Sequence, residues 1–566
     1  MNEFIYDLIE KLEQDDVRGI LAREDAPEYY YALSGDRQNV AEWLPLGKEM
    51  DVLFIGANYG AFCELAEKVR SLDIFDPTEN GLTVVRKRFG EKLSGLGDIG
   101  LHKSEPKKLY DMVIIPVISK YMLSYVEDSM EKISFGGGLG RAAEGDGSRK
   151  AGLKELLRYF SRFLKDGGSL LFSVDNRDAL RFFSGAEKRE GQCLVSRSEL
   201  DWALSGINFT QRKRYYPLPD MSFARDIFSD EYLPGEGDFR GVAQTFSGEG
   251  LALCDEEALY GRLSEKRVFP DFAPSYIQLL TGYHGEHIKE VVLMTEPRAV
   301  ILDESELPIY IRYNRRRDES YRLRTEIHDE DGRRFVRKTA LSEAGNDHIL
   351  SFEHKYELLK RTTENKDLHI LEPRIGRGRD GAMYAEFDYL KGRPLSALLA
   401  DDIEEGRAPL GKIKDALELL MGRGASECHN MDLVFENVMV CADGYWLIDY
   451  EWVFDVAPDR DYVRYRILRY WYEAYKESLY AYRDTADFLA EFGIKGELLS
   501  DCEEREESFQ SFVNGDGALD FPAKFAAHVK TVEDIKDESR RLQEFTEWNL
   551  RLQDEVEEHK TALRKM

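Results

Sequence analysis

The chain has 566 residues, 43% of them hydrophobic, which is enough for more than one domain with its own apolar core. Its formal net charge of −29 argues against a protein that binds nucleic acid through a basic surface. The six cysteines form no CxxC pair, and no apolar run is long enough to cross a membrane. The first residues lack a secretory signal pattern, so we expect a cytoplasmic protein with at most peripheral contact with the inner face of the plasma membrane.

The first half shows repeated pairs of an apolar strand and a helix. Short helices are expected over 1–49, and a buried strand at 51–55 then ends on the turn Gly56-Ala-Asn-Tyr-Gly60 and enters a helical segment at 61–69. A second strand at 72–75 ends at Asp76. A strand, a glycine turn and a helix in this order bring the backbone close to a ligand, and an acid after the second strand commonly binds a ribose. The pattern therefore predicts a nucleotide-type α/β unit.

This series resembles the class I S-adenosylmethionine-dependent methyltransferases over roughly residues 50–180, through the glycine turn, Asp76-Pro77 and the block LKDGGSLLFSV. The resemblance implies a Rossmann-like methyltransferase domain at 50–295. Aromatic residues and prolines among acids predict an insertion of irregular loops at 175–290, and the polar, glycine-rich sequence at 134–152 predicts a mobile loop. The resemblance also implies that Gly56, Asn58 and Gly60 border the cofactor and that Asp76 holds its ribose. Phe54 replaces the usual acid, and Asn58-Tyr59 replaces a third glycine. A scaffold that binds no cofactor therefore stays open as an alternative.

The second half contains a segment, His429 to Asp455, with the layout of a phosphoryl-transfer site. Asp432 stands five residues before Asn437, and Asp449 ends a later apolar strand. In kinases, an Asp in the first position accepts the hydroxyl proton, and an Asn and an Asp in the other two hold Mg²⁺. A DxxxxN pattern is common by chance, so a hairpin with ordinary loop carboxylates is the alternative for this segment alone.

Elements upstream of this segment match the order found in kinases. Strands are expected at 310–315, 321–328 and 334–340, and the third carries Lys338, which resembles the phosphate-binding lysine of kinases. A helix at 349–362 carries Glu353 and Glu357, one of which is expected to pair with Lys338, and its spacing favours Glu357. A later strand runs into a linker, where Glu386–Tyr389 are expected to contact the adenine of ATP.

Several departures refine this kinase hypothesis. No GxGxxG loop precedes Lys338, and His429 stands three residues before Asp432. These features resemble small-molecule and sugar kinases of the aminoglycoside-phosphotransferase type. We place this kinase-like domain at 300–485 and a helical linker at 486–530. The last segment, 531–566, has apolar residues at spacings of three and four, which predicts a coiled coil. A helix packed on the kinase-like lobe is its alternative.

The order of these parts resembles the bacterial bifunctional methyltransferase/kinase chain terminators of polymannose O-antigen. The resemblance implies an α/β Rossmann-like methyltransferase domain, an α+β two-lobed protein-kinase-like domain and a C-terminal coiled-coil segment that supports an oligomer. It implies S-adenosylmethionine, ATP and Mg²⁺ as cofactors, a glycan or sugar-phosphate substrate, and a glycosyltransferase partner. The expected reactions are phosphorylation of a sugar hydroxyl and a following methylation. Two alternatives stay open, namely a kinase with a cofactor-free first domain and a non-catalytic assembly protein that recruits glycosyltransferases.

Overall fold

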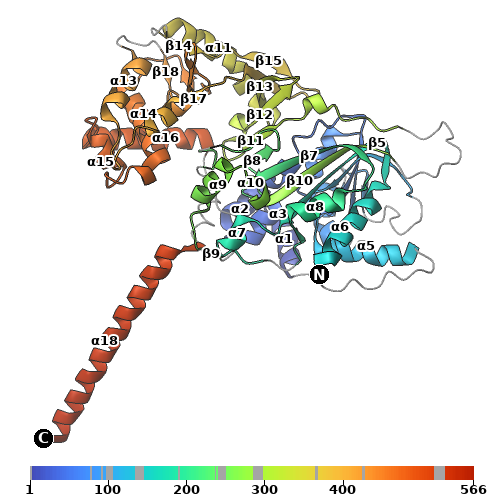
Figure 1. Ribbon diagram of the computed structural model, residues 1–566, viewed down its shortest axis with the longest axis horizontal. Coiled ribbons are helices and arrows are strands. Elements are labelled where there is room, and N and C mark those ends of the chain that lie inside the picture. Colours follow the sequence, from blue (N-terminus) through green and yellow to red (C-terminus); the bar gives the residue numbers. More distant parts are fainter. Residues whose placement is uncertain are drawn as a thin grey trace.

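The computed structural model describes most of the chain, and Figure 1 shows two bodies and a long helix that leaves them. The described residues are 3–76, 79–90, 93–96, 106–133, 146–188, 191–235, 237–239, 250–284, 298–363, 367–422, 428–515 and 529–565. Most of the predicted glycine-rich loop at 134–152 lies outside these ranges, since the description resumes at residue 146.

A parallel sheet forms the centre of the first body. Its strands lie in the order β3 (Gly95–Leu96), β2 (Ser71–Phe75), β1 (Asp51–Ile55), β4 (Tyr110–Ile115) and β5 (Leu164–Asn176). Every residue of β1 and β4 is buried, which explains their nearly continuous apolar sequences. The strand order reverses between β1 and β4, and ligands of open α/β sheets bind at such a switch point. The sheet confirms the predicted Rossmann-like α/β fold.

The sheet continues into the segment for which we predicted irregular loops. Strand β10 (Ser275–Tyr283) pairs antiparallel with β5, and β7 (Phe209–Leu218) and β8 (Asp226–Ser229) follow it. The prediction of irregular loops for 175–290 is thus wrong for these three strands. The polar run Gln211–Arg214 within β7 hides the alternation of apolar and polar residues that would have indicated a strand.

Helices cover the first body. In Figure 1, α5 (Lys120–Ile133), α6 (Asp146–Ser161) and α8 (Arg197–Leu204) lie side by side in front of the sheet, and they pack in that order. The chain begins with α1 (Glu3–Gln14), α2 (Val17–Arg23) and α3 (Pro27–Leu33), and α1 packs against α4 (Glu79–Phe89). The first three helices lie within residues 1–49, and α3 packs near the glycine turn.

The strands of the second half extend the same sheet. Strand β11 (Tyr310–Asn314) pairs with β8, and β12 (Leu323–Glu330), β13 (Arg333–Ala340), β16 (Met383–Asp388) and β15 (Arg374–Arg377) follow. All of these pairs are antiparallel. Helix α11 (Asn346–Thr362) packs on β13 and β16. The two halves therefore share one sheet, which fixes their mutual orientation through backbone hydrogen bonds.

A mainly helical body follows, and Figure 1 places its helices beside the end of this sheet. Its helices are α12 (Leu395–Ala400), α13 (Leu410–Met421), α14 (Arg460–Tyr475), α15 (Thr485–Ala490) and α16 (Glu497–Asn514), and its short strands are β14 (Leu368–Ile370), β17 (Arg393–Pro394), β18 (His429–Asn430), β19 (Val438–Cys441), β20 (Gly444–Leu447) and β21 (Val453–Phe454). One apolar cluster runs from Leu323 to Val513. Buried Glu506 of α16 pairs with Arg466 of α14. The body thus extends to Asn514, beyond the predicted boundary at 485.

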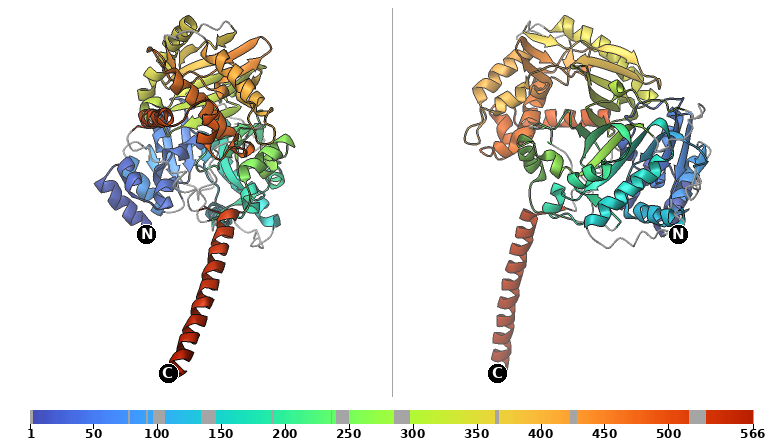
Figure 2. Two further views of the ribbon diagram at one scale, coloured as in Figure 1. Left: turned by 90° about the vertical axis from the view of Figure 1, so that its left-hand side faces the viewer. Right: turned by 45° about the vertical axis from the view of Figure 1, so that its right-hand side comes forward.

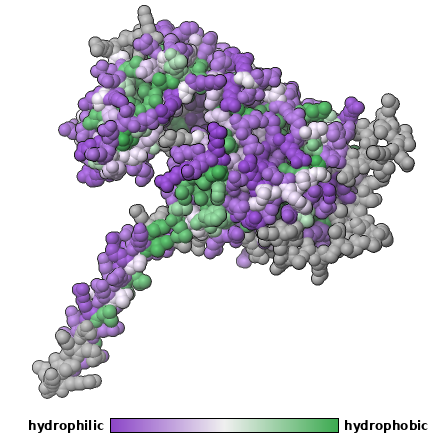
Figure 3. All heavy atoms as spheres, in the orientation of Figure 1, coloured by the Kyte–Doolittle hydropathy of each residue, from purple (hydrophilic) through white to green (hydrophobic). Residues whose placement is uncertain are grey.

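The C-terminal segment is a single helix, α18 (Val532–Lys565), which projects away from both bodies in both views of Figure 2. It follows β22 (Val529–Thr531), which pairs with β9 (Gly250–Ala252) of the first half. The alternative of a helix packed on the kinase-like lobe is therefore not what the structure shows. Apolar and polar residues alternate along it (Figure 3), and Leu542 and Phe545 are exposed. Within the described ranges, every helix is too short or too polar to span a bilayer.

Candidate functional site

A cluster of charged side chains lies between β13 and the segment that follows β20. Lys338 of β13 places its Nζ 2.7 Å from Asp449 Oδ1 and also contacts the carboxylate of Glu451. Both Lys338 and Glu451 are buried. Burial alone would lower the pKa of Lys338, but the negative charges of Asp449 and Glu451 raise it above its usual value. Lys338 therefore stays positively charged, and its ammonium group is oriented toward Asp449, which we predicted to bind the metal.

Asp432 and Asn437 lie in the loop that connects β18 to β19. The Asp432 carboxylate accepts a hydrogen bond from the Trp452 backbone N–H at 2.8 Å, and its carbonyl accepts one from Asn437 Nδ2 at 2.9 Å. Burial, together with the negative charges of Asp449 and Glu451, raises the pKa of Asp432 to about 7. A carboxylate with this pKa can accept a proton near neutral pH, which is the property that a general base needs.

The structure contradicts the predicted pair of Lys338 with Glu357. Glu353 and Glu357 are both exposed on α11. The buried face of this helix is set by Ile349, Phe352, Tyr356 and Leu359, and this rotation turns both glutamates to solvent. Lys355 points inward instead, and its Nζ donates to the carbonyl of Glu451. Burial lowers the pKa of Lys355 to about 8.

Most of the segment that we expected to contact adenine lies inside a strand and not in a linker. Glu386 lies inside β16, which ends only at Asp388, and it pairs with Arg337 of β13 at 2.6 Å. Tyr389 begins the connection to the helical body, and its backbone N–H donates to the carbonyl of Arg334 at 3.3 Å. Of the predicted Glu386–Tyr389 segment, only Tyr389 belongs to the connection between β16 and the helical body.

Arg317 and His348 complete the cluster, and we predicted neither. The carboxylate of Glu451 also contacts the guanidinium of Arg317, which lies over the ring of Trp452 at 5.6 Å. His348 of α11 places its Nε2 3.7 Å from Glu451, and burial lowers the pKa of this histidine. The position of Glu451 two residues after Asp449 is a usable signal in the sequence. Arg317 offers no such signal, because it lies in a run of three arginines far upstream.

Asn437 and Asp449 are the side chains of this site that we predicted to bind a metal. Their oxygens suit Mg²⁺, which needs few protein ligands. In the part of the chain that the structure describes, no three His, Cys, Asp or Glu side chains are arranged to hold a metal ion. Asn437 and Asp449 supply one amide and one carboxylate oxygen. Mg²⁺ commonly keeps several waters and binds one or two protein oxygens together with substrate phosphates. The chemistry of these two oxygens fits Mg²⁺ that is bound together with phosphates.

The predicted turn of the first half is present at the end of β1. Gly56 has a φ of +98°, and Asn58 and Tyr59 also adopt positive φ values, of 44° and 56°. Asp76 lies directly after β2, and its carboxylate accepts a hydrogen bond from the Ala57 N–H at 2.7 Å. The structure thus brings together the turn and the predicted ribose-binding acid at the switch point.

The helix predicted at 61–69 does not form as an α-helix. The turn passes into two short 3₁₀ segments, η2 (Asn58–Gly60) and η3 (Cys63–Lys68). Two bulky residues with positive φ take up the positions from which a regular helix would begin. The turn therefore lacks the row of backbone N–H groups that a long helix presents to a ligand.

Side chains from neighbouring elements cover this turn. Buried Arg37 donates to the side-chain oxygen of Asn58 at 2.8 Å and to its carbonyl at 3.2 Å. Arg88 donates to the Tyr59 carbonyl at 2.7 Å. A Cβ atom placed on Gly56 would lie 2.8 Å from the Met122 methyl group and 3.1 Å from Asn58 Nδ2. The space over Gly56, which the predicted cofactor would approach, is therefore lined closely by Met122 and Asn58.

No protein-family model and no curated protein matches this chain. Among solved structures, the chain is similar to the N-methyltransferase NodS from Bradyrhizobium japonicum, with 13% identity over 44% of this chain and 97% of that one, and a TM-score of 0.25. It is similar to the bifunctional kinase-methyltransferase WbdD, with 14% identity over 77% of each chain and a TM-score of 0.22. A third similarity is to Haemonchus contortus phosphoethanolamine N-methyltransferase 1, with 13% identity over 51% of this chain and 50% of that one, and a TM-score of 0.26. Because these scores are low, we base the function on side-chain geometry.

Proposed function

We propose that the second half is a phosphotransferase that uses ATP and Mg²⁺ to phosphorylate a sugar hydroxyl on a cell-surface polysaccharide. The observation that carries this proposal is the meeting of Lys338, Asp432 and Asp449 in one partly buried cluster. The three residues come from strand β13, the loop after β18 and the segment after β20. Their arrangement places a cation for phosphate beside a base and a metal-binding carboxylate, as phosphoryl transfer requires.

Each residue has a distinct role in this proposal. Asp432 accepts the proton of the attacking hydroxyl, for which its pKa of about 7 suits it. Asn437 and Asp449 would hold Mg²⁺, which would neutralise phosphate charge when bound with ATP. Lys338 now pairs with Asp449 and would transfer its contact to a phosphate oxygen. Glu451 keeps Lys338 in place, while Arg317 compensates the charge of Glu451.

The sugar acceptor and the partner belong to the same proposal. The sequence around Asp432 resembles that of small-molecule and sugar kinases, which supports a hydroxyl of a glycan or sugar phosphate as acceptor. Helix α18 is long, exposed and lined with apolar side chains such as Leu542 and Val556. We propose that it contacts a glycosyltransferase or forms a coiled-coil oligomer at the membrane surface.

We propose a second activity for the first half, namely S-adenosylmethionine-dependent methylation of the new phosphate or of a sugar oxygen. Its support is the position of Asp76 beside the turn at the switch point of the sheet. S-adenosylmethionine would supply the methyl group, Asp76 would hold its ribose, and Gly56 and Gly60 would border its methionine part. Asn58 and Met122 would have to withdraw first. The bonds from Arg37 to Asn58 favour the alternative, a scaffold without a cofactor.

The test of the phosphotransferase uses carboxylate variants of the full chain. We expect Asp432→Ala to bind Mg·AMP-PNP but to lose ATP turnover and glycan phosphorylation, and Asp449→Ala to lose both binding and turnover. Asp455→Ala, which changes an exposed aspartate of the same segment, is the matched control. If both cluster variants left the product glycan and ATP turnover unchanged, the chain would be a non-catalytic assembly protein.

The methyltransferase proposal is tested separately by isothermal titration calorimetry with S-adenosylmethionine. Binding that is lost in Asp76→Ala supports the second activity. Absence of binding to the wild-type protein would leave the scaffold as the correct description of the first half, with the phosphotransferase unaffected.

A further inference from the structure

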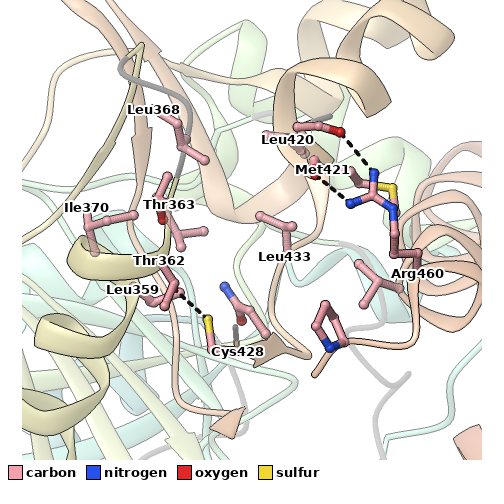
Figure 4. Close-up of a pocket in the computed structure, with 15 residues that line it drawn as sticks. Leu359, Thr362, Thr363, Leu368, Ile370, Leu420, Met421, Cys428, Leu433 and Arg460 are labelled. Carbon is pink, nitrogen blue, oxygen red and sulfur yellow. Dashed lines mark hydrogen bonds between the residues drawn. The ribbon is translucent and has the colours of Figure 1, made fainter. Parts of the chain in front are cut away.

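A cavity lies behind the loop that carries Asp432, where the ends of α11 and α13 and the start of α14 meet (Figure 4). Its volume is about 80 Å³. Aliphatic side chains form most of its wall, among them Leu359, Leu420, Leu433 and Val463. Lys338, Asp449 and Glu451 do not line it, so it is separate from the proposed phosphate site. Leu433 directly follows Asp432, and the cavity therefore shares one wall with the candidate catalytic loop.

Asn430 gives this apolar cavity a polar group that lacks a partner. Its side chain lines the cavity and is 7% exposed. Its Oδ1 accepts a hydrogen bond from the Asp432 N–H at 2.9 Å, while its Nδ2 has no hydrogen-bond partner among the described residues. Buried donors in folded proteins are nearly always paired, because an unpaired one loses its hydration without compensation. Nδ2 is therefore a donor that an acceptor in the cavity could pair.

Three other polar side chains of the cavity already have partners. Thr362 Oγ1 lies 3.0 Å from Cys428 Sγ, and Arg460 donates to the carbonyls of Met421 and Gly422 at 3.1 and 2.9 Å. Figure 4 shows these contacts at opposite sides of the cavity. A buried water needs two to four polar partners, so the aliphatic wall makes water a poor occupant. An organic molecule with a single acceptor atom matches the wall and Asn430 better.

We propose that this cavity binds a small organic molecule with a branched apolar body and one acceptor oxygen, which accepts a hydrogen bond from Asn430 Nδ2. The apolar body lies against Leu359, Leu433 and Val463, where it removes aliphatic surface from water. Because Asn430 also holds the Asp432 N–H, the ligand fixes the position of the catalytic loop. This regulatory consequence rests on the proposed phosphotransferase, whereas binding in the cavity does not.

The binding test uses the wild-type protein and two matched probes. Methyl isopropyl ketone carries a branched body and one acceptor, and the alkene in which a methylene group replaces the ketone oxygen has the same shape without the acceptor. We expect the ketone to shift the methyl resonance of Met421 and to slow modification of Cys428 by methyl methanethiosulfonate, measured by peptide mass spectrometry. The alkene should bind about tenfold more weakly, because it leaves Asn430 Nδ2 unpaired. Equal effects of both probes, or no effect of the ketone, would overturn the proposal.

Two variants add to this test. Asn430→Asp keeps an acceptor for the Asp432 N–H but has no donor, so its affinity for the ketone should fall about tenfold. Val463→Phe fills the cavity from α14 and should abolish the effect of the ketone on Met421. Ketone binding that persists in both variants would place it elsewhere. Mg·AMP-PNP binding is measured in parallel, so that a failure of the phosphotransferase proposal is seen separately from a failure of the cavity proposal.

Discussion

The two candidate sites differ in what holds them in their present arrangement. At the turn of the first half, Arg37 and Arg88 donate to neutral oxygens of Asn58 and Tyr59, and Met122 lies over Gly56. In the second half, the cation of Lys338 lies against the carboxylates of Asp449 and Glu451. A nucleotide with its metal brings the same kinds of charge and can replace such contacts. A cofactor at the turn must instead displace side chains that are packed in place.

This difference predicts that a ligand enters the second site at a lower energetic cost than the first. Exchange of one charge partner for another conserves most of the electrostatic energy, so Lys338 can move from a carboxylate to a phosphate. Displacement of Asn58 and Met122 breaks a hydrogen bond and opens packing with no equivalent replacement. The contrast can be tested at each site with single substitutions.

The largest effect is expected for Lys338→Met. The change removes the cation that we propose to bind phosphate and leaves the buried carboxylate of Glu451 with fewer partners. ATP turnover should fall about 10³-fold, and the free energy of unfolding should fall by about 3 kcal/mol. Enzyme kinetics and urea denaturation measure the two losses. Lys360→Met on the exposed face of α11 is the control, and equal behaviour of the two variants would contradict the site.

Asp432→Asn should stabilise the metal-free protein while it abolishes turnover. The pKa of Asp432 is about 7 in the folded chain, against an ordinary value of 3.8 in the unfolded one. Between these values the folded state binds more protons, so wild-type stability falls as pH rises. The variant should therefore gain about 2 kcal/mol at pH 8, and the gain should vanish below about pH 4. Thermal unfolding across this pH range checks the sign, and a gain that is independent of pH would refute the raised pKa.

A smaller effect is expected for Asn58→Gly in the first half. Glycine adopts the positive φ of this position without strain and removes the side chain that lies over the turn. The affinity for S-adenosylmethionine should rise about tenfold, as calorimetry would show. Asn208→Gly, at an exposed position of the same body, should change nothing. If neither Asn58→Gly nor the wild-type protein binds, packing is not what excludes the cofactor.

The smallest effect is expected for Glu357→Gln. Since Glu357 is exposed and does not pair with Lys338, ATP turnover should stay within about twofold of wild type. Lys355→Gln on the inward face of the same helix should reduce it more, because Lys355 holds the backbone of Glu451. Steady-state kinetics distinguish the two, and a larger loss for Glu357→Gln would restore the pair expected from spacing.

Local sequence determined the elements and much of the candidate site. The buried strands of the first half, the strand of Lys338 and the loop with Asp432 and Asn437 follow from apolar runs and motif spacing, which depend on neighbours in the chain. The same reasoning missed β7, where charged residues interrupt the alternation, and it placed the strand end near Glu386 too early. Such boundaries depend on pairing with strands that are distant in sequence.

Only the tertiary structure decided which side chains meet. The rotation of α11 is set by the apolar residues that it buries, and this turned Glu357 outward and Lys355 inward. The contacts of Arg317 with Glu451 and of Arg37 with Asn58 join segments whose spacing in the chain carries no signal. Sequence by itself determined which chemical groups the protein has and on which elements they lie. Long-range packing determined their partners, because a charge or a hydrogen bond acts across space and not along the chain.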